Sequence, residues 1–490
     1  MKGTARFCGS LAAMAAFCPG AVLAEPIEVG GERQLFVDRA FFAEAEGVAL
    51  RLHPAWKTGE RVLQYDRPWE SATLNWFTVL QDRGVVDPEA RYRMWYECYD
   101  VPGWPTTDDT SFCYAESRDG RRWTKPELGR WEYQGSTRNN ILFRQIGAAE
   151  HRSRVHGCGV FIDPTAPPAA RYKAVSQGLW QGLTPPYRIA GMVSPDGLAW
   201  TRLPVPICDL FADSQYSGFW DPSLGSYVLY GRVAGNIGRA ASADFAHFSP
   251  LELVLAADAQ DPPNSNLYNA AVTRLPGVAN VYLQFPSLYR RDPASDTLDI
   301  RLAVSRDGVH WTYPDQGQAF IPLGEAGAWD SGSLYMGQGL VTVGDELWLY
   351  YSGSPLRHQE AELENLVACA QPRAYSRVVV RRDRFVSAEG APGGGWLVTP
   401  PLRFAGTRLR LNADVRAGGA IRVALLDESR TVLPGRGLED CVPISGDHLE
   451  APVHWQSGHD VGALAGRPIR LRFEVRDASL FGFQFVTAPP

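Results

Sequence analysis

The sequence predicts an all-β protein in which a five-bladed β-propeller is followed by a C-terminal β-sandwich. The first reason is a series of runs rich in β-branched and aromatic residues, which are typical of strands. The second is a turn motif containing an aspartate, which recurs five times before residue 390. The third is a change near residue 391, where a glycine-rich segment precedes further short strand patterns. The clearest strand runs are residues 92–96, 172–175, 227–230, 281–285 and 347–351.

The N-terminal residues 1–24 have the features of a secretory signal peptide. Lys2 and Arg6 supply a positive start, residues 11–17 are apolar, and Ala24 is a small residue at the expected cleavage position. We therefore expect a mature chain that begins at Glu25 and is secreted or periplasmic. Because the apolar stretch is short, we expect no membrane insertion after cleavage.

The aspartate turns define the propeller repeat, which we assign to residues 25–390. Asp-Gly pairs suit the positive φ angles of tight hairpin turns, and a nearby aromatic residue can pack between sheets. The four intervals between the first and last aspartate average 66 residues, enough for a four-stranded blade with its loops. The alternative is a large β-sandwich with chance turns. The five aspartates are Asp119, Asp196, Asp244, Asp307 and Asp383.

Residues 391–490 are predicted to form a separate β-sandwich accessory domain. Residues 391–395 contain three glycines and a proline, as in a linker. Residues 408–412, 421–425 and 469–475 alternate or are β-branched, with Gly and Asp turns between them.

Composition excludes several classes of protein. With 45% hydrophobic and 21% charged residues, the chain is neither disordered nor a coiled coil. The formal net charge is −6 and no run of Lys and Arg stands out, so we expect no nucleic-acid partner. The cysteines beyond the leader lack metal-ligand spacing, so we expect no metal site and no cofactor. Cys98 and Cys113 could face each other across a hairpin.

The two faces of the predicted propeller differ in composition. If the aspartate turns join the third and fourth strands of each blade, they share one face. The starts of the inner strands and the links between second and third strands then share the other face. That face collects carboxylates, aromatic rings and a few cations. Such a mixture is typical of a sugar-binding funnel, because rings stack on pyranoses and carboxylates bind hydroxyl groups.

Carboxylates on that face are the predicted catalytic residues, since glycoside hydrolysis needs a proton donor and a second carboxylate as base or nucleophile. We predict Glu70 as the general acid, flanked by Trp69, and Asp213 or Asp330 as base or nucleophile. Glu97, Asp38 and Asp299 are reserves. The alternative for each carboxylate is a loop cap or an ion pair with arginine.

Rings and polar side chains on the same face are predicted to bind the substrate. The alternative role for the aromatic rings is packing between blades. The alternative for the cations is exposure to solvent at the rim. Arg290, Arg291 and His358 could bind an anionic sugar or phosphate. The predicted substrate-binding residues are Trp69, Trp76, Arg154, His156, Tyr216, Tyr268, Asn269, Arg290, Arg291, Trp329 and His358.

Several segments resemble the β-fructosidase superfamily, which includes glycoside hydrolase families 32, 43, 68 and 130. The resemblance is closer to a group described as family-32 N-terminal-domain-like. It implies a five-bladed propeller with carboxylates at the starts of inner strands, and the likeness to family 43 implies a possible calcium ion in the axial channel. The matching segments are residues 35–38, 68–70, 93–96, 113–117, 304–308 and 446–447.

The sequence thus predicts a secreted glycoside hydrolase that cleaves a plant, algal or microbial oligosaccharide or polysaccharide by carboxylate acid/base chemistry. One alternative is a glycan-binding propeller without activity. The other is a glycoside phosphorylase, although a secreted location argues against it.

Overall fold

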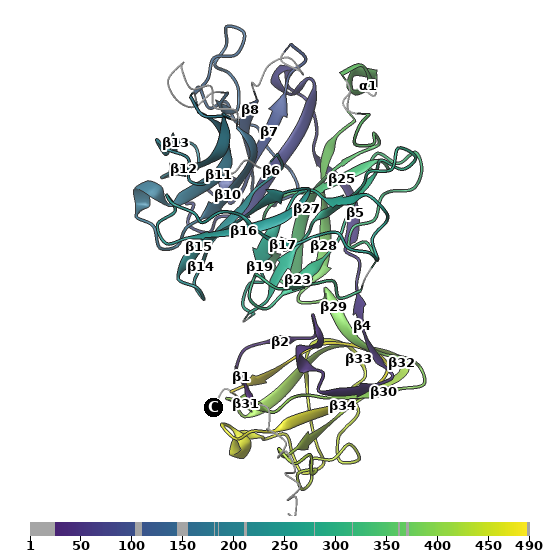
Figure 1. Ribbon diagram of the computed structural model, residues 1–490. Coiled ribbons are helices and arrows are strands. Elements are labelled where there is room, and N and C mark those ends of the chain that lie inside the picture. Colours follow the sequence, from purple (N-terminus) through teal and green to yellow (C-terminus); the bar gives the residue numbers. More distant parts are fainter. Residues whose placement is uncertain are drawn as a thin grey trace, which may run out of the picture.

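The computed structural model is built almost entirely of strands (Figure 1). Among the described residues the one α-helix is α1 (Leu363–Ala368). The predicted leader and Arg154 lie outside the described residues. The described residues are 25–102, 110–144, 155–180, 182–184, 186–209, 213–278, 280–315, 317–360, 363–368 and 372–487. Short 3-10 helices are η1 (Arg39–Phe41), η2 (Pro68–Glu70), η3 (Pro88–Ala90), η4 (Pro168–Ala170) and η5 (Gly462–Leu464).

Three four-stranded antiparallel meanders follow one another along the chain, each with its strands in sequence order. The first is β6 (Thr73–Gln81), β7 (Tyr92–Tyr99), β8 (Ser111–Ser117) and β9 (Ile141–Phe143). The second is β10 (His156–Ile162), β11 (Tyr172–Leu179), β12 (Tyr187–Ser194) and β13 (Thr201–Arg202). The third is β14 (Ser217–Asp221), β15 (Ser226–Val233), β16 (Asn236–Ser242) and β17 (Glu252–Leu255).

A fourth meander and a larger sheet complete a propeller-like ring, as predicted. The larger sheet has the order β18-β21-β22-β25-β27-β28-β5, with β26 beside β27. β5 comes from the N-terminal part of the chain and closes the sheet against β28. The meander is β19 (Val272–Arg274), β20 (Tyr282–Gln284), β23 (Ala303–Ser305) and β24 (Trp311–Thr312). The larger sheet holds β18 (Ser265–Leu267), β21 (Ser287–Arg290), β22 (Leu298–Ile300), β25 (Ser333–Met336), β26 (Val341–Val343), β27 (Glu346–Ser354), β28 (Ala374–Arg381) and β5 (Trp56–Leu63).

The predicted aspartate turns join third and fourth strands in the four meanders. In the first, the Asp119 carboxylate accepts the backbone N–H groups of Arg121 at 2.8 Å and Arg122 at 2.9 Å, and Gly120 has a φ of 71°. The turns at Asp196, Asp244 and Asp307 repeat this pattern. These four turns confirm the predicted repeat.

The prediction for the fifth turn, at Asp383, is wrong in one respect. The chain continues from this turn into β29 (Val386–Gly390), which belongs to the C-terminal sheet. β5 supplies the strand outside β28 instead. Asp383 is buried and pairs with Arg33 at 3.2 Å, so this turn anchors the N-terminal segment to the ring.

The C-terminal part is an eight-stranded sheet dominated by two long strands, β32 (Arg408–Leu426) and β34 (Arg470–Val486). A two-sheet sandwich stays a prediction. The N-terminal strands pair here: β1 with β31, β2 with β34, β3 with β30 and β4 with β29. The N-terminal strands thus pair with the C-terminal part, whereas the sequence predicted that residues 25–390 belong to the propeller. The sequence did not reveal this, because such short strands show no hydrophobic periodicity. Their bounds are β1 (Ile27–Gly30), β2 (Gln34–Leu35), β3 (Glu44–Glu46), β4 (Val48–Leu52), β30 (Gly395–Val398), β31 (Leu402–Phe404) and β33 (Gly446–Pro452).

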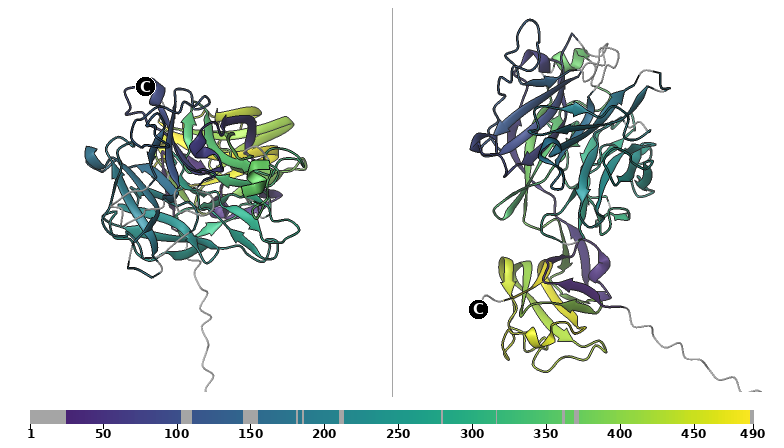
Figure 2. Two further views of the ribbon diagram at one scale, coloured as in Figure 1. Left: turned by 90° about the horizontal axis from the view of Figure 1, so that it is seen from above. Right: turned by 90° about the vertical axis from the view of Figure 1, so that its left-hand side faces the viewer.

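The ring and the C-terminal sheet lie one above the other, joined through β4, β5, β28 and β29 (Figures 1 and 2). Their contact is apolar: Leu35 and Leu52 pack in one core with Phe285 and Leu349 of the ring. The C-terminal sheet has its own core.

Inner strands of neighbouring sheets approach so closely that their backbones hydrogen-bond to each other. Gln338 N–H donates to the Phe77 carbonyl at 3.0 Å, and Tyr216 N–H donates to the Gly157 carbonyl at 2.9 Å. A Cβ at Gly159 would lie 2.1 Å from the Tyr216 carbonyl oxygen, which explains the glycine. The middle of the ring is therefore packed, and a cavity of about 440 Å³ lies along the later residues of the inner strands, lined among others by Leu80, Ile162 and Trp220.

Candidate functional site

The end of the ring remote from the C-terminal sheet is the one where α1 lies (Figure 1). The link between β27 and β28, which contains α1, also carries His358, and aromatic rings from other elements contact this histidine. We call this end the upper mouth and define it by Trp76, Tyr268, Tyr335 and His358. Trp76 stacks on Tyr268 with ring centroids 6.1 Å apart, and Tyr335 meets Trp76 edge-on at 5.1 Å. His358 lies 4.9 Å from Tyr268. Tyr268, predicted at the start of an inner strand, therefore contacts both Trp76 of another such start and His358 of a second-to-third link.

Two sheets supply these rings. Trp76 is on β6 of the first meander, whereas Tyr268, directly after β18, and Tyr335, on β25, belong to the larger sheet. His358 comes from the link between β27 and β28, and its Nδ1 is 2.6 Å from the Tyr335 hydroxyl. Burial lowers the pKa of His358 to about 4 and raises the pKa of Tyr335. Both side chains are thus neutral at pH 7 and can exchange hydrogen bonds with hydroxyl groups.

An arginine and a carboxylate border the rings. The Arg232 guanidinium on β15 lies 4.2 Å from the centre of the Tyr268 ring. Its Nη1 donates to both Asp213 oxygens, at 2.8 and 2.9 Å. The Asp213 side chain is 48% exposed, so solvent or a ligand reaches this carboxylate.

A buried carboxylate positions His156 beside Asp213. Glu97, on β7, is only 1% exposed, and its Oε1 lies 2.9 Å from His156 Nδ1. The carboxylate also accepts the Tyr99 hydroxyl at 2.8 Å and the Gly157 N–H at 2.9 Å. His156 Nε2 lies 3.0 Å from the Asp213 carbonyl oxygen. Both ring nitrogens therefore face oxygen atoms, which fixes the orientation of the ring.

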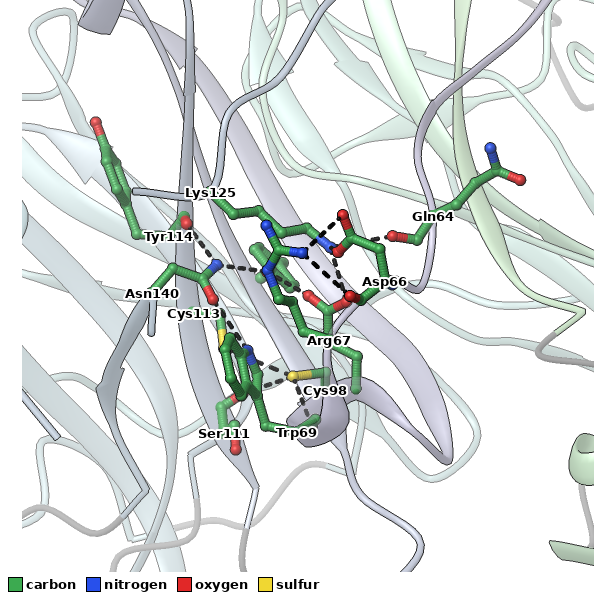
Figure 3. Close-up of polar contacts among 12 residues, drawn as sticks. Gln64, Asp66, Arg67, Trp69, Cys98, Ser111, Cys113, Tyr114, Lys125 and Asn140 are labelled. Atoms are coloured by element: carbon green, nitrogen blue, oxygen red, sulfur yellow. Dashed lines mark hydrogen bonds and ion pairs between the residues drawn. The ribbon is translucent and has the colours of Figure 1, made fainter. Parts of the chain in front are cut away.

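Glu70, the predicted general acid, lies away from the upper mouth. Its fully buried carboxylate accepts Lys125 Nζ at 2.7 Å and the Tyr96 hydroxyl at 2.6 Å, and Lys125 also binds Asp66 at 2.6 Å (Figure 3). Trp69, predicted to bind substrate, donates to Asn140 at 2.9 Å and packs in the core between the first and last sheets. Both side chains have the contacts of interior residues.

Asp330, the third predicted catalytic carboxylate, is also buried away from Asp213. It accepts Lys57 Nζ at 2.8 Å and the Tyr351 hydroxyl at 2.9 Å. Trp329 stacks on Tyr351, with ring centroids 5.9 Å apart. Among the described contacts, Glu70, Asp213 and Asp330 share no partner, so the structure does not join them into one catalytic group.

Four further predicted residues take interior or rim positions. Tyr216 is fully buried, and Asn269 donates to the Met336 carbonyl at 2.7 Å. Arg290 pairs with Asp299 at 2.5 Å, and Arg291 is exposed. Of the predicted site residues that the structure describes, those that come together at the upper mouth are Trp76, His156, Asp213, Tyr268 and His358.

Sequence reasoning missed three members of the upper mouth and kept Glu97 only as a reserve. The missed residues are Arg232, Tyr335 and Arg373, whose guanidinium lies 5.0 Å from the Tyr335 ring. Arg232 is next to the last residue of β15, and Arg373 directly precedes β28. Arg232 thus lies at the end of a second strand, and Arg373 lies at the start of a third strand. His358 was selected because it lies in a link between second and third strands, and the same criterion would have selected both arginines.

Within the described part of the chain, no three His, Cys, Asp or Glu side chains are grouped so as to hold a metal ion. The described helices include none with the length and apolar character needed to span a membrane. Cys98 and Cys113 are free thiols with their Sγ atoms 3.6 Å apart.

No family model matches the chain, and no curated protein matches it. Solved structures similar to it include a glycoside hydrolase at 14% identity and a TM-score of 0.46, covering 66% of this chain and 92% of that one. Another is an N-acetylgalactosamine deacetylase from F. plautii in complex with blood group B trisaccharide, at 13% identity and a TM-score of 0.45, covering 69% and 96%. A third comes from work on family 130 mannoside phosphorylases and hydrolases that target β-1,2 mannosidic linkages in Candida mannan, at 15% and 0.41, covering 71% and 97%. At such identities, activity has to be argued from the site.

Proposed function

We propose that the protein is a glycoside hydrolase that binds a glycan at the upper mouth. The observation that carries this proposal is the exposed Asp213 carboxylate beside the Trp76 and Tyr268 rings. The partly exposed Tyr268 ring suits the C–H face of a pyranose, and a carboxylate suits its hydroxyl groups. The predicted leader, residues 1–24, supports a secreted or periplasmic location.

Asp213 and His156 are the residues to which we assign the chemistry. Asp213 would take a proton from the attacking water as general base, and Arg232 holds its carboxylate in place. His156 would give a proton to the leaving oxygen, while Glu97 holds its Nδ1. This assignment replaces Glu70 and Asp330, whose buried ion pairs leave them no access to substrate.

The test is release of reducing sugar from a panel of plant, algal and microbial glycans. We expect Asp213→Asn and His156→Gln each to lower kcat at least about 100-fold, as loss of a general acid or base does. Asp345→Asn is the matched control, because this exposed aspartate also lies near an arginine, Arg382. Full activity in Asp213→Asn and His156→Gln would overturn the assignment.

A glycan-binding protein without activity is the second candidate. It is favoured by the buried ion pairs of Glu70 and Asp330, which leave Asp213 as the accessible carboxylate among the predicted three. This candidate predicts binding without turnover in the wild-type protein, with affinity retained in Asp213→Asn. Turnover of any glycan by wild-type protein would exclude it.

A further inference from the structure

One cation at the upper mouth has no carboxylate partner among the described residues. Arg232 is paired with Asp213, and His156 with Glu97. Arg373 lies beside the same rings, and its contacts to the described residues are with two hydroxyls, Ser352 Oγ at 3.2 Å and Ser333 Oγ at 3.4 Å. Within the described residues, no carboxylate lies at ion-pair distance from this guanidinium. Arg373 can therefore accept a carboxylate without displacing a described one.

Two further donors at the same place have no acceptor among the described residues. The Trp76 side chain is only 6% exposed, yet its indole Nε1–H is buried without a hydrogen-bond partner. Arg232 Nε is likewise buried and without one. Buried donors are normally satisfied, so unused donors around a cluster of rings indicate a ligand rich in acceptors.

We infer that the glycan bound at the upper mouth is acidic, with a uronic-acid carboxylate as the partner of Arg373. This inference rests on the proposed binding of a glycan at this mouth. A carboxylate only accepts hydrogen bonds and fits the guanidinium fork with two oxygens, whereas a neutral hydroxyl brings no charge. Arg373 is 5.0 Å from the Tyr335 ring, which is 5.7 Å from the partly exposed Tyr268 ring, so a sugar against Tyr268 has its substituents near the cation.

Arg373 thus takes the role that the sequence suggested for Arg290. The Arg290 guanidinium is already paired with Asp299, which Arg301 also binds at 2.7 Å. An anion that bound Arg290 would have to displace an internal carboxylate. At Arg373 the described contacts that it would displace are hydrogen bonds with two hydroxyls, which are weaker.

The test compares uronate-containing oligosaccharides with the same oligosaccharides after carboxyl reduction, by calorimetry on the full chain. The panel is oligogalacturonate, oligomannuronate and glucuronoxylan fragments. We expect at least one acidic member to bind, and its reduced form to bind about 10- to 100-fold more weakly, the range for a charge-assisted contact. Arg373→Gln should remove this preference without changing affinity for the reduced form. Arg83→Gln, an exposed arginine at the opposite end, is the control.

Each other outcome has a definite meaning. If neutral glycans bind as well as acidic glycans or better, the inference is overturned and the proposed function still stands. If acidic glycans bind but are not cleaved, the inference is supported and the proposed hydrolase activity is excluded. Cleavage that requires inorganic phosphate, with a raised KM for phosphate in Arg373→Gln, would assign the cation to phosphate and overturn the inference. If Arg373→Gln fails to fold, Arg373→Lys and the salt dependence of wild-type binding test the inference instead. Binding of the acidic glycan should weaken as salt is added, because only a charged contact weakens with salt.

Discussion

The Glu70–Lys125 pair offers the sharpest test of structure against sequence prediction. Both side chains are buried, at 0% and 5% exposure, with Nζ and Oε2 2.7 Å apart. Lys125→Met leaves the Glu70 carboxylate buried with only the Tyr96 hydroxyl and the Asp66 N–H as donors. Removing one partner of a buried pair costs about 3–5 kcal/mol of folding free energy. Glu70→Gln should cost less, about 1–3 kcal/mol, because Lys125 keeps its partner Asp66.

The double variant Glu70→Gln/Lys125→Met should be no less stable than Lys125→Met alone, since no buried charge is left unpaired. The assay is urea unfolding followed by hydrogen exchange in peptides from β6 to β9, because the ring and the C-terminal sheet can unfold separately. Glu252→Gln, on the exposed side of β17, is the control and should change stability by less than about 0.5 kcal/mol. A Glu70→Gln protein of wild-type stability that has lost all hydrolysis would refute the structural role and restore Glu70 as a catalyst.

Three other predictions concern groups in the ring. Burial keeps the pKa of His358 near 4, below its ordinary 6.5, so its ring resonances should stay constant in NMR from pH 7.5 to 5. Because the pKa of this imidazole is lower in the folded chain, protonation favours the unfolded chain. The contribution of the neutral His358 ring to folding stability is therefore complete above pH 6.5 and is lost as the pH falls toward 4. Titration of the His358 ring near pH 6.5 in the folded protein would contradict this burial. Gly339→Ala should destabilise the ring by at least about 1–3 kcal/mol in thermal unfolding, because the Cβ would lie 2.0 Å from the Val79 carbonyl oxygen; Gly393→Ala, with open space, is the control. The fully buried Cys98, whose pKa burial raises, should react with maleimide only after unfolding, and rapid labelling of native protein would disprove its burial.

The ring could be predicted from the sequence because its signals are local. Each aspartate turn is made within a few residues, as when Asp119 accepts the N–H groups of the two residues that follow Gly120. The failure at Asp383 has the opposite cause. Whether the next strand pairs with β28 or with the C-terminal sheet depends on β5 and β34, which are far away in sequence.

The catalytic carboxylates could not be predicted in the same way, because their environment is set by distant partners. Glu70 is neutralised by a lysine 55 residues later, and Asp330 by Lys57, 273 residues earlier. A carboxylate at the start of an inner strand reads the same in sequence whether it meets a buried lysine or solvent. Only three-dimensional packing separates Asp213 from these two.

Trp76 and His156 were predicted from the sequence to bind substrate, and the structure places both at the upper mouth. Both lie at irregularities in the pairing of the inner strands. The pairing of β6 with β7 shifts register between Leu74 and Phe77, which encloses Trp76. The pairing of β10 with β11 shifts between His156 and Gly159. Register shifts of this kind redirect side chains that regular alternation would place against a neighbouring sheet. The upper mouth therefore depends on these two bulges, and a substitution that restores regular pairing there should remove binding while leaving the ring folded.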